Sequence, residues 1–120
     1  MVEYARPGSQ RVVPKRRLAR RWLAVEGIRL VARGYGLEVA TLMEGKTWEI
    51  AFARQVAIHL AVKVAGLSYE EAAGMFARHR QTVWLAISRV AEASEDAGVR
   101  KVVERYEAAL ARKMAKKEGK

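Results

Sequence analysis

The chain has 120 residues, of which 51% are hydrophobic, with a formal net charge of +10 and a sequence pI of about 10.4. This length suits one domain with a modest core, and the absence of cysteine excludes a disulfide framework and a thiolate metal site. No apolar run approaches the roughly 18 residues of a membrane span. Residues 1–21 lack the apolar stretch of a signal peptide, so we expect a soluble cytoplasmic protein.

The positive charge is concentrated at the two ends of the chain. Residues 1–21 hold 7 Lys or Arg and 1 acid, residues 100–120 hold 8 and 3, and residues 22–99 hold 8 and 9. A pI above about 9 with clustered Lys and Arg is typical of nucleic-acid-binding proteins. Charge alone leaves DNA, RNA and an acidic protein surface open as partners.

The first half of the sequence predicts a mobile arm and then helices. Residues 1–14 include two prolines and a Gly-Ser pair, which predict a flexible basic arm. From Lys15, apolar residues recur at helical spacing: Leu18, Trp22, Val25, Ile28, Val31, Ala32 and Tyr35. Gly34 and Gly36 end this helix. A short helix at residues 39–43 and a longer one at residues 49–65 follow.

The second half predicts a helix-turn-helix. Ser68 and Glu71 fit a capping box, in which each side chain bonds the other residue's backbone amide. The helix that they open ends near Phe76. After a basic turn, another helix runs to about Ala93, and its inward-facing residues are Val83, Ala86, Ile87 and Val90.

A final amphipathic segment has an apolar stripe of Val99, Val103, Tyr106, Leu110 and Met114. We expect this stripe to pack on the helix of residues 15–35, and the alternative is that it docks a second subunit or another protein. No stretch alternates with a period of two, so the predicted fold class is all-α. The chain then divides into an arm at residues 1–14, a helix-turn-helix domain at 15–98 and an extra basic helix at 99–120.

Basic and polar residues open the second helix of the predicted helix-turn-helix, which in this motif enters the DNA major groove. Arg80 has the geometry to pair with guanine, and Gln81 with adenine. Thr82 offers a hydroxyl group. Trp84 and Leu85 lie off the buried stripe, within reach of thymine methyls or sugars. A plain αα-hairpin with surface arginines is the alternative, and the pattern alone leaves both open.

Four blocks of residues occur in order through the middle of the chain. They are VARGYGLEVATL (31–42), RQVAIHL (54–60), Leu67-Ser68 with Phe76, and Thr82-Val83. These blocks resemble the C-terminal DNA-binding domain of DnaA, the bacterial replication initiator, whose signature reads Arg-Gln-x-Ala-x-x-Leu, Leu-Ser-Leu-Pro-x-Ile-Gly-x-x-Phe-Gly and Asp-His-Thr-Thr-Val. The resemblance covers about residues 28–92 and implies duplex DNA binding. The phosphate loop of the initiator's ATPase is absent from the sequence.

The pattern and the resemblance together give three sets of candidate DNA contacts. The base-reading set in the major groove is His79, Arg80, Gln81, Thr82 and Leu85. The phosphate-binding set is Arg54, Gln55, Lys63, Ser68 and Arg78. The minor-groove or arm set is Lys46, Lys15, Arg16 and Arg17.

Departures from the family signature concentrate at the turn. The turn is one residue shorter, Asp-His-Thr-Thr has become residues 79–82, and Glu70 replaces a proline. His79 replaces an aspartate that caps the helix, so we expect the second helix to start less firmly until DNA binds. The basic loop is reduced to residues 46–49. We therefore expect binding to a DNA sequence other than the initiator's own box.

The resemblance implies one of two roles in the bacterial nucleoid. Free-standing alphaproteobacterial relatives include transcriptional regulators, such as the DNA-binding half of gene transfer agent activators, and small replication regulators that act through DnaA. The first role favours a separate protein that contacts RNA polymerase as partner, and the second favours DnaA itself. A third alternative is an adaptor with non-specific nucleic-acid binding. The two histidines, His59 and His79, lack ligand spacing, so we expect no metal, cofactor or catalysis.

Overall fold

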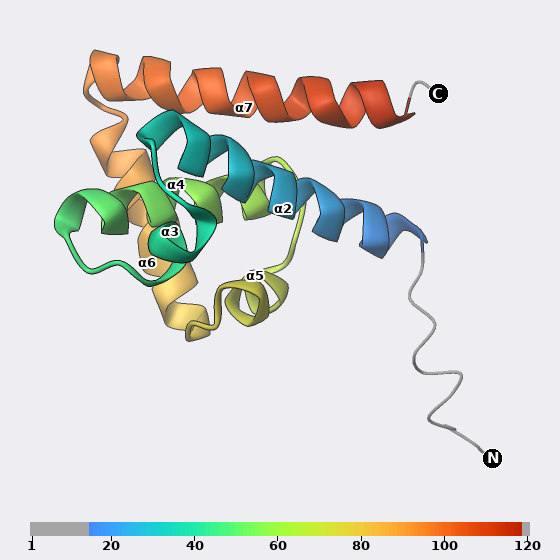
Figure 1. Cartoon of the computed structure of the whole chain (residues 1–120), viewed down its shortest axis with the longest axis horizontal. Helices are drawn as coiled ribbons and strands as arrows, with labels where there is room; N and C mark the ends of the chain where they lie inside the picture. The colour runs from blue at the N-terminus through green and yellow to red at the C-terminus, as the bar shows by residue number, and fades with distance from the viewer. Residues whose placement is uncertain (1–14, 119–120) are drawn as a thin grey trace.

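The computed structural model describes residues 15–118, with side chains placed for residues 18–117. Within this range all regular structure is helical, which confirms the predicted fold class. The helices are α2 (Lys15–Tyr35), α3 (Val39–Glu44), α4 (Trp48–Lys63), α5 (Tyr69–Phe76), α6 (Arg80–Ala93) and α7 (Ala97–Glu118) (Figure 1). No described helix is both long and apolar enough to cross a membrane. The arm predicted at residues 1–14 lies outside the described residues.

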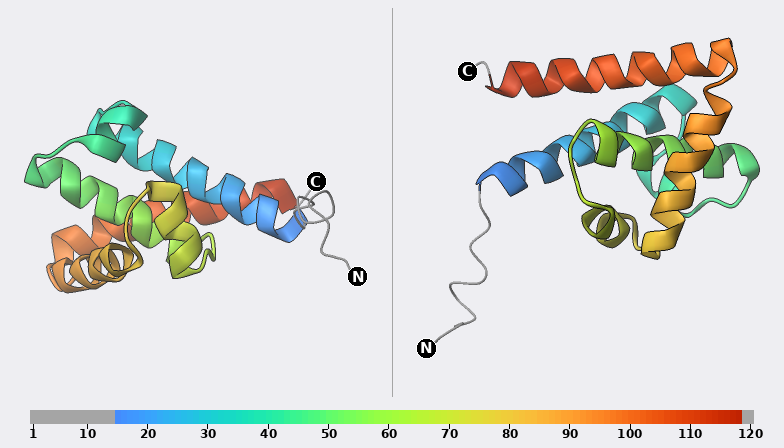
Figure 2. Two further views of the ribbon diagram at one scale, coloured as in Figure 1. Left: turned by 90° about the horizontal axis from the view of Figure 1, so that it is seen from below. Right: turned by 180° about the vertical axis from the view of Figure 1, so that it is seen from behind.

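Helix α4 forms the centre of the bundle, because it contacts each of the other described helices. Helix α7 lies along one side of the molecule beside α2 (Figure 1). The turn between α5 and α6 lies on the opposite side, and the view from behind shows the same separation (Figure 2). The bundle therefore has two distant sides, one built around the helix-turn-helix and one built around α7.

One apolar cluster fills the space around α4, and every fully buried side chain among the described residues is apolar. Helix α6 contributes the four residues predicted to face inward, Val83, Ala86, Ile87 and Val90. Helix α2 differs from its predicted stripe, because Leu23 and Ala24 are buried while Leu18 and Trp22 remain 50% and 36% exposed. The first turns of α2 extend past the end of α4, which leaves that part of the stripe less covered (Figure 1).

The helix boundaries follow local signals in the sequence. Gly36 and Gly66, with φ of 68° and 84°, adopt the left-handed backbone that ends α2 and α4. The predicted capping box is confirmed: the amide of Glu71 donates to Ser68 Oγ over 3.0 Å, and the amide of Ser68 donates to Glu71 Oε1 over 2.8 Å. This box fixes where α5, the first helix of the helix-turn-helix, begins.

Helix α7 packs on α2 and α4 through the predicted apolar stripe. Val103 and Leu110 are buried, and Tyr106 stacks on Tyr35 with ring centroids 6.5 Å apart. Polar contacts add to this packing, since His59 Nε2 of α4 lies 2.6 Å from Glu107 Oε2 of α7. The stripe therefore joins α7 to the body of the same chain, as expected.

Candidate nucleic-acid interface

The turn between α5 and α6 is tight and contains a strained residue. Ala77 ends α5 in the left-handed region with φ of 54°, and its amide donates to Gly74 O over 3.3 Å. The amide of Arg78 donates to Ala73 O over 2.9 Å. A left-handed conformation costs a residue with a Cβ atom about 1–2 kcal/mol. Ala77 therefore carries a local cost at the position where the family signature has glycine.

His79 is the N-cap of α6, and its imidazole makes the capping bond itself. The amide of Gln81 donates to His79 Nδ1 over 3.1 Å. The capping position is therefore filled, with the ring nitrogen as acceptor in place of the aspartate oxygen, and the weaker helix start stays a prediction.

The residues that follow the cap form an exposed polar group at the start of α6. Arg80, Gln81 and Thr82 are all exposed, because Val83 is the first residue of the helix that faces the core. Arg80 Nη1 donates to Glu70 Oε2 over 3.1 Å, and the two side chains are 65% and 77% exposed. The ion pair joins the two helices of the motif at the exposed surface, where such pairs contribute little to stability.

Two predicted phosphate ligands, Arg54 and Arg78, are bound to the end of α3. Arg54 Nη1 donates to the carbonyl oxygens of Leu42, Met43 and Gly45 over 3.0, 3.3 and 3.0 Å. Arg78 Nη2 donates to Met43 O over 2.9 Å. Carbonyl oxygens at a helix C-terminus carry partial negative charge, so both guanidinium groups stabilise this end of α3.

The environment of Arg54 is also electrostatically unfavourable for its charge. Burial lowers the pKa of the Arg54 guanidinium, and the neighbouring positive charge of Arg78 lowers it further. Each guanidinium has five N–H donors, and the bonds described above use Nη1 of Arg54 and Nη2 of Arg78. The remaining donors leave both residues chemically able to bind a phosphate oxygen as well.

A small hollow between α4 and α6 brings several predicted residues together. Gln55, Thr82 and Leu85 line it together with Arg54 and Arg78, and Leu85 is 41% exposed. Arg89 lines the same hollow and was missed by the sequence reasoning. Its signal is the helical spacing of residues 82, 85 and 89, which places Arg89 on the face of α6 that carries Thr82.

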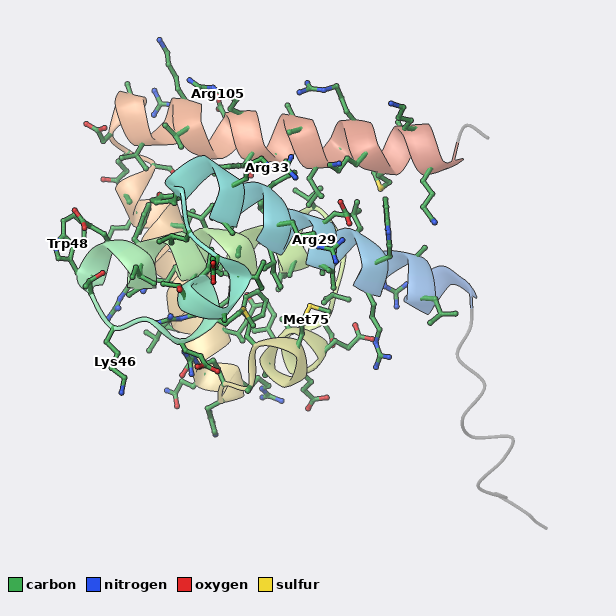
Figure 3. The ribbon with its side chains drawn as sticks, in the orientation of Figure 1. Arg29, Arg33, Lys46, Trp48, Met75 and Arg105 are labelled. Carbon is green, nitrogen blue, oxygen red and sulfur yellow. The ribbon has the colours of Figure 1, made fainter. Side chains whose placement is uncertain are left out.

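Other predicted contacts lie around this hollow or away from it. Lys46 is exposed in the loop between α3 and α4 and extends away from the body (Figure 3). It borders a hollow shared with Arg54 and Arg78. Lys63 is exposed at the opposite end of α4, about 14 Å along the axis from Arg54. Ser68 is committed to its capping box.

The remaining predicted contacts are Lys15, Arg16 and Arg17. Their backbone belongs to α2, and their side chains lie outside the described residues. The arrangement around the turn is that of a helix-turn-helix, with an exposed polar start to its second helix and with Arg54 and Arg78 in the adjoining hollows.

Comparison with known protein families also identifies a helix-turn-helix. The family model of the bacterial DnaA protein helix-turn-helix matches residues 28–90, from the second half of α2 to the end of the buried stripe of α6. Neither the curated proteins nor the solved structures gave a match. The matched segment contains α5, the turn and most of α6, so the chain carries a DNA-binding domain. Because the match covers more than half of the sequence, this chain belongs to the bacterial DnaA helix-turn-helix family.

Proposed function

We propose that this protein binds duplex DNA sequence-specifically and acts as a transcriptional regulator at promoters. The observation that carries the proposal is the exposed group formed by Arg80, Gln81 and Thr82 directly after the His79 cap. The N-terminal residues of a recognition helix are those that reach base edges. Arg80 and Gln81 are also residue types that form bidentate pairs with guanine and adenine, respectively.

In the proposed complex, α6 enters the major groove with its N-terminus first. Arg80 leaves Glu70 to reach a base, which is feasible because the 3.1 Å ion pair is exposed. Arg89, further along α6, and Lys46, in the loop before α4, supply phosphate contacts that set its position. Thr82 lines the hollow with Gln55, and its hydroxyl contributes to the same backbone contacts.

The composition of the base-reading group favours transcription over replication control. Residues 79–82 replace the Asp-His-Thr-Thr of the family signature, so the site recognised should differ from the initiator's box. A replication regulator that acts on the initiator through protein contacts would not need a new base-reading group. A transcriptional regulator needs one, because its target is a different DNA sequence.

Selection of bound duplexes from a random library tests the base-reading assignment. Arg80→Ala and Gln81→Ala should each weaken binding to the selected site by about 1–3 kcal/mol and relax the preference at one base pair. Arg33→Ala removes the same charge from an exposed position on α2 and should leave the preference unchanged. Unchanged binding by both recognition variants would show that α6 does not read the site.

Chromatin immunoprecipitation with sequencing separates the two cellular roles. A transcriptional regulator should give sharp peaks at a small number of promoters. Enrichment confined to the replication origin would contradict the proposal and support a role in replication. The Arg80→Ala variant is the control, since promoter peaks that depend on base reading should disappear with it.

A further inference from the structure

The solvent-facing side of α7 carries four cations in a row, here called the outer stripe. Its members are Lys101, Arg105, Arg112 and Lys116, and all four are exposed. At 3.6 residues per turn they fall within an arc of about 60°, opposite the buried Val103 and Leu110. Arg105 points away from the body of the molecule (Figure 3).

Among the described residues, the cations of the outer stripe differ from the other cations of α7 because they form no ion pair or side-chain hydrogen bond. Arg100 Nη1 donates to Ser94 O over 3.0 Å, Lys113 Nζ lies 3.6 Å from Glu26 Oε1, and Lys117 Nζ lies 4.5 Å from the Trp22 ring centroid. Within the described residues, none of the four stripe cations forms an ion pair or a side-chain hydrogen bond. Those three cations help to hold α7 in place, whereas the four stripe cations face solvent and are available to a binding partner.

The residues beside the stripe cations indicate the chemistry of the partner. Ala108 and Ala115 border the stripe on one side and are exposed, and the exposed Val102 borders it on the other. Protein interfaces have an apolar core with aromatic residues, which this surface lacks. Small side chains beside the cations instead allow a charged backbone to approach the helix closely. The stripe therefore fits a polyanion better than a folded protein.

The length of the outer stripe matches a segment of DNA backbone. Residues 101–116 extend for about 22 Å along the helix axis. One DNA strand places a phosphate every 3.4 Å or so along the duplex, so about six phosphates lie within this length. Among the residues of α7 whose side chains are described, Glu104 is the one exposed acid, and it lies to one side of the stripe. The net charge of this surface is thus clearly positive.

The position of α7 decides which DNA the outer stripe meets. Helix α7 lies on the side of the molecule opposite the α5–α6 turn, in views from the front and from behind (Figure 1, Figure 2). A duplex held by the start of α6 would have to bend around the whole bundle to reach α7. We propose that the outer stripe binds a second DNA duplex through its phosphates, so that one molecule bridges two DNA segments.

A two-duplex capture assay tests this proposal. One duplex that carries the selected site is fixed to beads, the full-length protein is added, and a fluorescent duplex of unrelated sequence is offered in solution. The parent protein should retain the fluorescent duplex at low salt. The glutamine variant carries Lys101→Gln, Arg105→Gln, Arg112→Gln and Lys116→Gln. It should retain at least about tenfold less of the fluorescent duplex, because binding to phosphates falls with each lost cation.

Matched variants separate this effect from unfolding and from loss of the first duplex. The charge-preserving variant Lys101→Arg, Arg105→Lys, Arg112→Lys and Lys116→Arg should bridge as well as the parent protein. The glutamine variant should keep its helical circular dichroism and its affinity for the selected site. The inference rests on DNA binding by α6, so the double variant Arg80→Ala, Gln81→Ala is tested separately for salt-dependent binding to the unrelated duplex through the stripe.

Three results would overturn the proposal. Equal bridging by the glutamine variant would mean that two molecules associate and each holds one duplex through α6. A weaker affinity for a single duplex, with a smaller salt dependence, would place the stripe on the same DNA as α6. Binding of the stripe to polyglutamate without capture of a second duplex would identify an acidic polypeptide as its partner.

Discussion

The helix-turn-helix side and the α7 side of this protein both carry cations, but the cations are held differently. Around the turn, Arg54 and Arg78 donate to carbonyl oxygens at the end of α3, and Arg80 pairs with Glu70. On α7, the four cations of the outer stripe have no such partner within the described residues. Arginine is thus bonded within the fold at Arg54 and Arg78, whereas Arg105 and Arg112 carry charges that face solvent.

This difference indicates two kinds of contact with DNA. Cations held by other groups have defined positions, so Arg54 and Arg78 suit phosphate contacts that fix the position and orientation of α6 on the duplex. Free cations on long side chains suit contacts that depend on charge alone and weaken strongly with salt. Because Arg54 and Arg78 are bonded within the fold, substitution of either residue should change the stability of the protein as well as its affinity for DNA.

Substitution of Arg54 should give the largest loss of stability. Arg54→Ala removes the donor shared by three carbonyl oxygens at 3.0–3.3 Å and leaves them partly buried. We expect the free energy of unfolding to fall by about 2–4 kcal/mol, measured by urea denaturation. Arg89→Ala is the control, because Arg89 is exposed and should change stability by no more than about 0.5 kcal/mol. Equal losses would show that the α3 contacts contribute nothing.

The packing of α7 on α2 should be sensitive to a single methyl group. A Cβ atom at Gly34 would collide with the Tyr106 hydroxyl and come within 2.8 Å of its Cζ. Gly34→Ala should therefore lower the free energy of unfolding by about 1–3 kcal/mol. It should also weaken bridging by α7 more than binding to the selected site.

Gly74 provides the matched control for Gly34. It lies within α5, and a Cβ atom there would meet nothing within 4 Å. Gly74→Ala should stabilise the protein by about 0.4–1 kcal/mol, because alanine loses less backbone entropy on folding. A stabilising Gly34→Ala would mean that Tyr106 moves aside at no cost and that the α2–α7 packing is looser than the structure indicates.

Features that depend on neighbouring residues could be predicted from the sequence. The Ser68–Glu71 box is a contact between residues three apart, and the inward face of α6 follows from helical spacing alone. The family signature added the helix-turn-helix itself. These signals lie within short segments of the sequence, so they can be recognised without the tertiary structure.

Contacts between distant residues could not be predicted in this way. Arg78 reaches Met43, which is 35 residues away, and no pattern near either residue indicates this bond. The exposure of Leu18 and Trp22 depends on where α4 ends relative to α2, which periodicity does not encode. The cap formed by His79 depends on ring orientation, so residue type alone did not indicate this bond.

Removal of the Glu70–Arg80 ion pair should give the smallest change in stability. It also tests whether this pair holds Arg80 in the geometry that reads a base. Glu70→Gln removes an exposed ion pair, so stability should change by no more than about 1 kcal/mol. DNA affinity should rise about two- to threefold at low salt for all sequences alike, because Arg80 is released and a negative charge near the phosphates is removed. Electrophoretic mobility shifts with the selected and unrelated duplexes measure both.

Glu38→Gln is the matched control for this prediction, since Glu38 is exposed and makes no capping bond at the start of α3. Its effect on affinity gives the part due to net charge alone. If Glu70→Gln instead lowers affinity for the selected site while unrelated duplexes bind as before, the pair holds Arg80 in its reading geometry. Arg80 would then be held in place by another group, as Arg54 and Arg78 are. The cations without such a partner among the described residues would contact phosphates only.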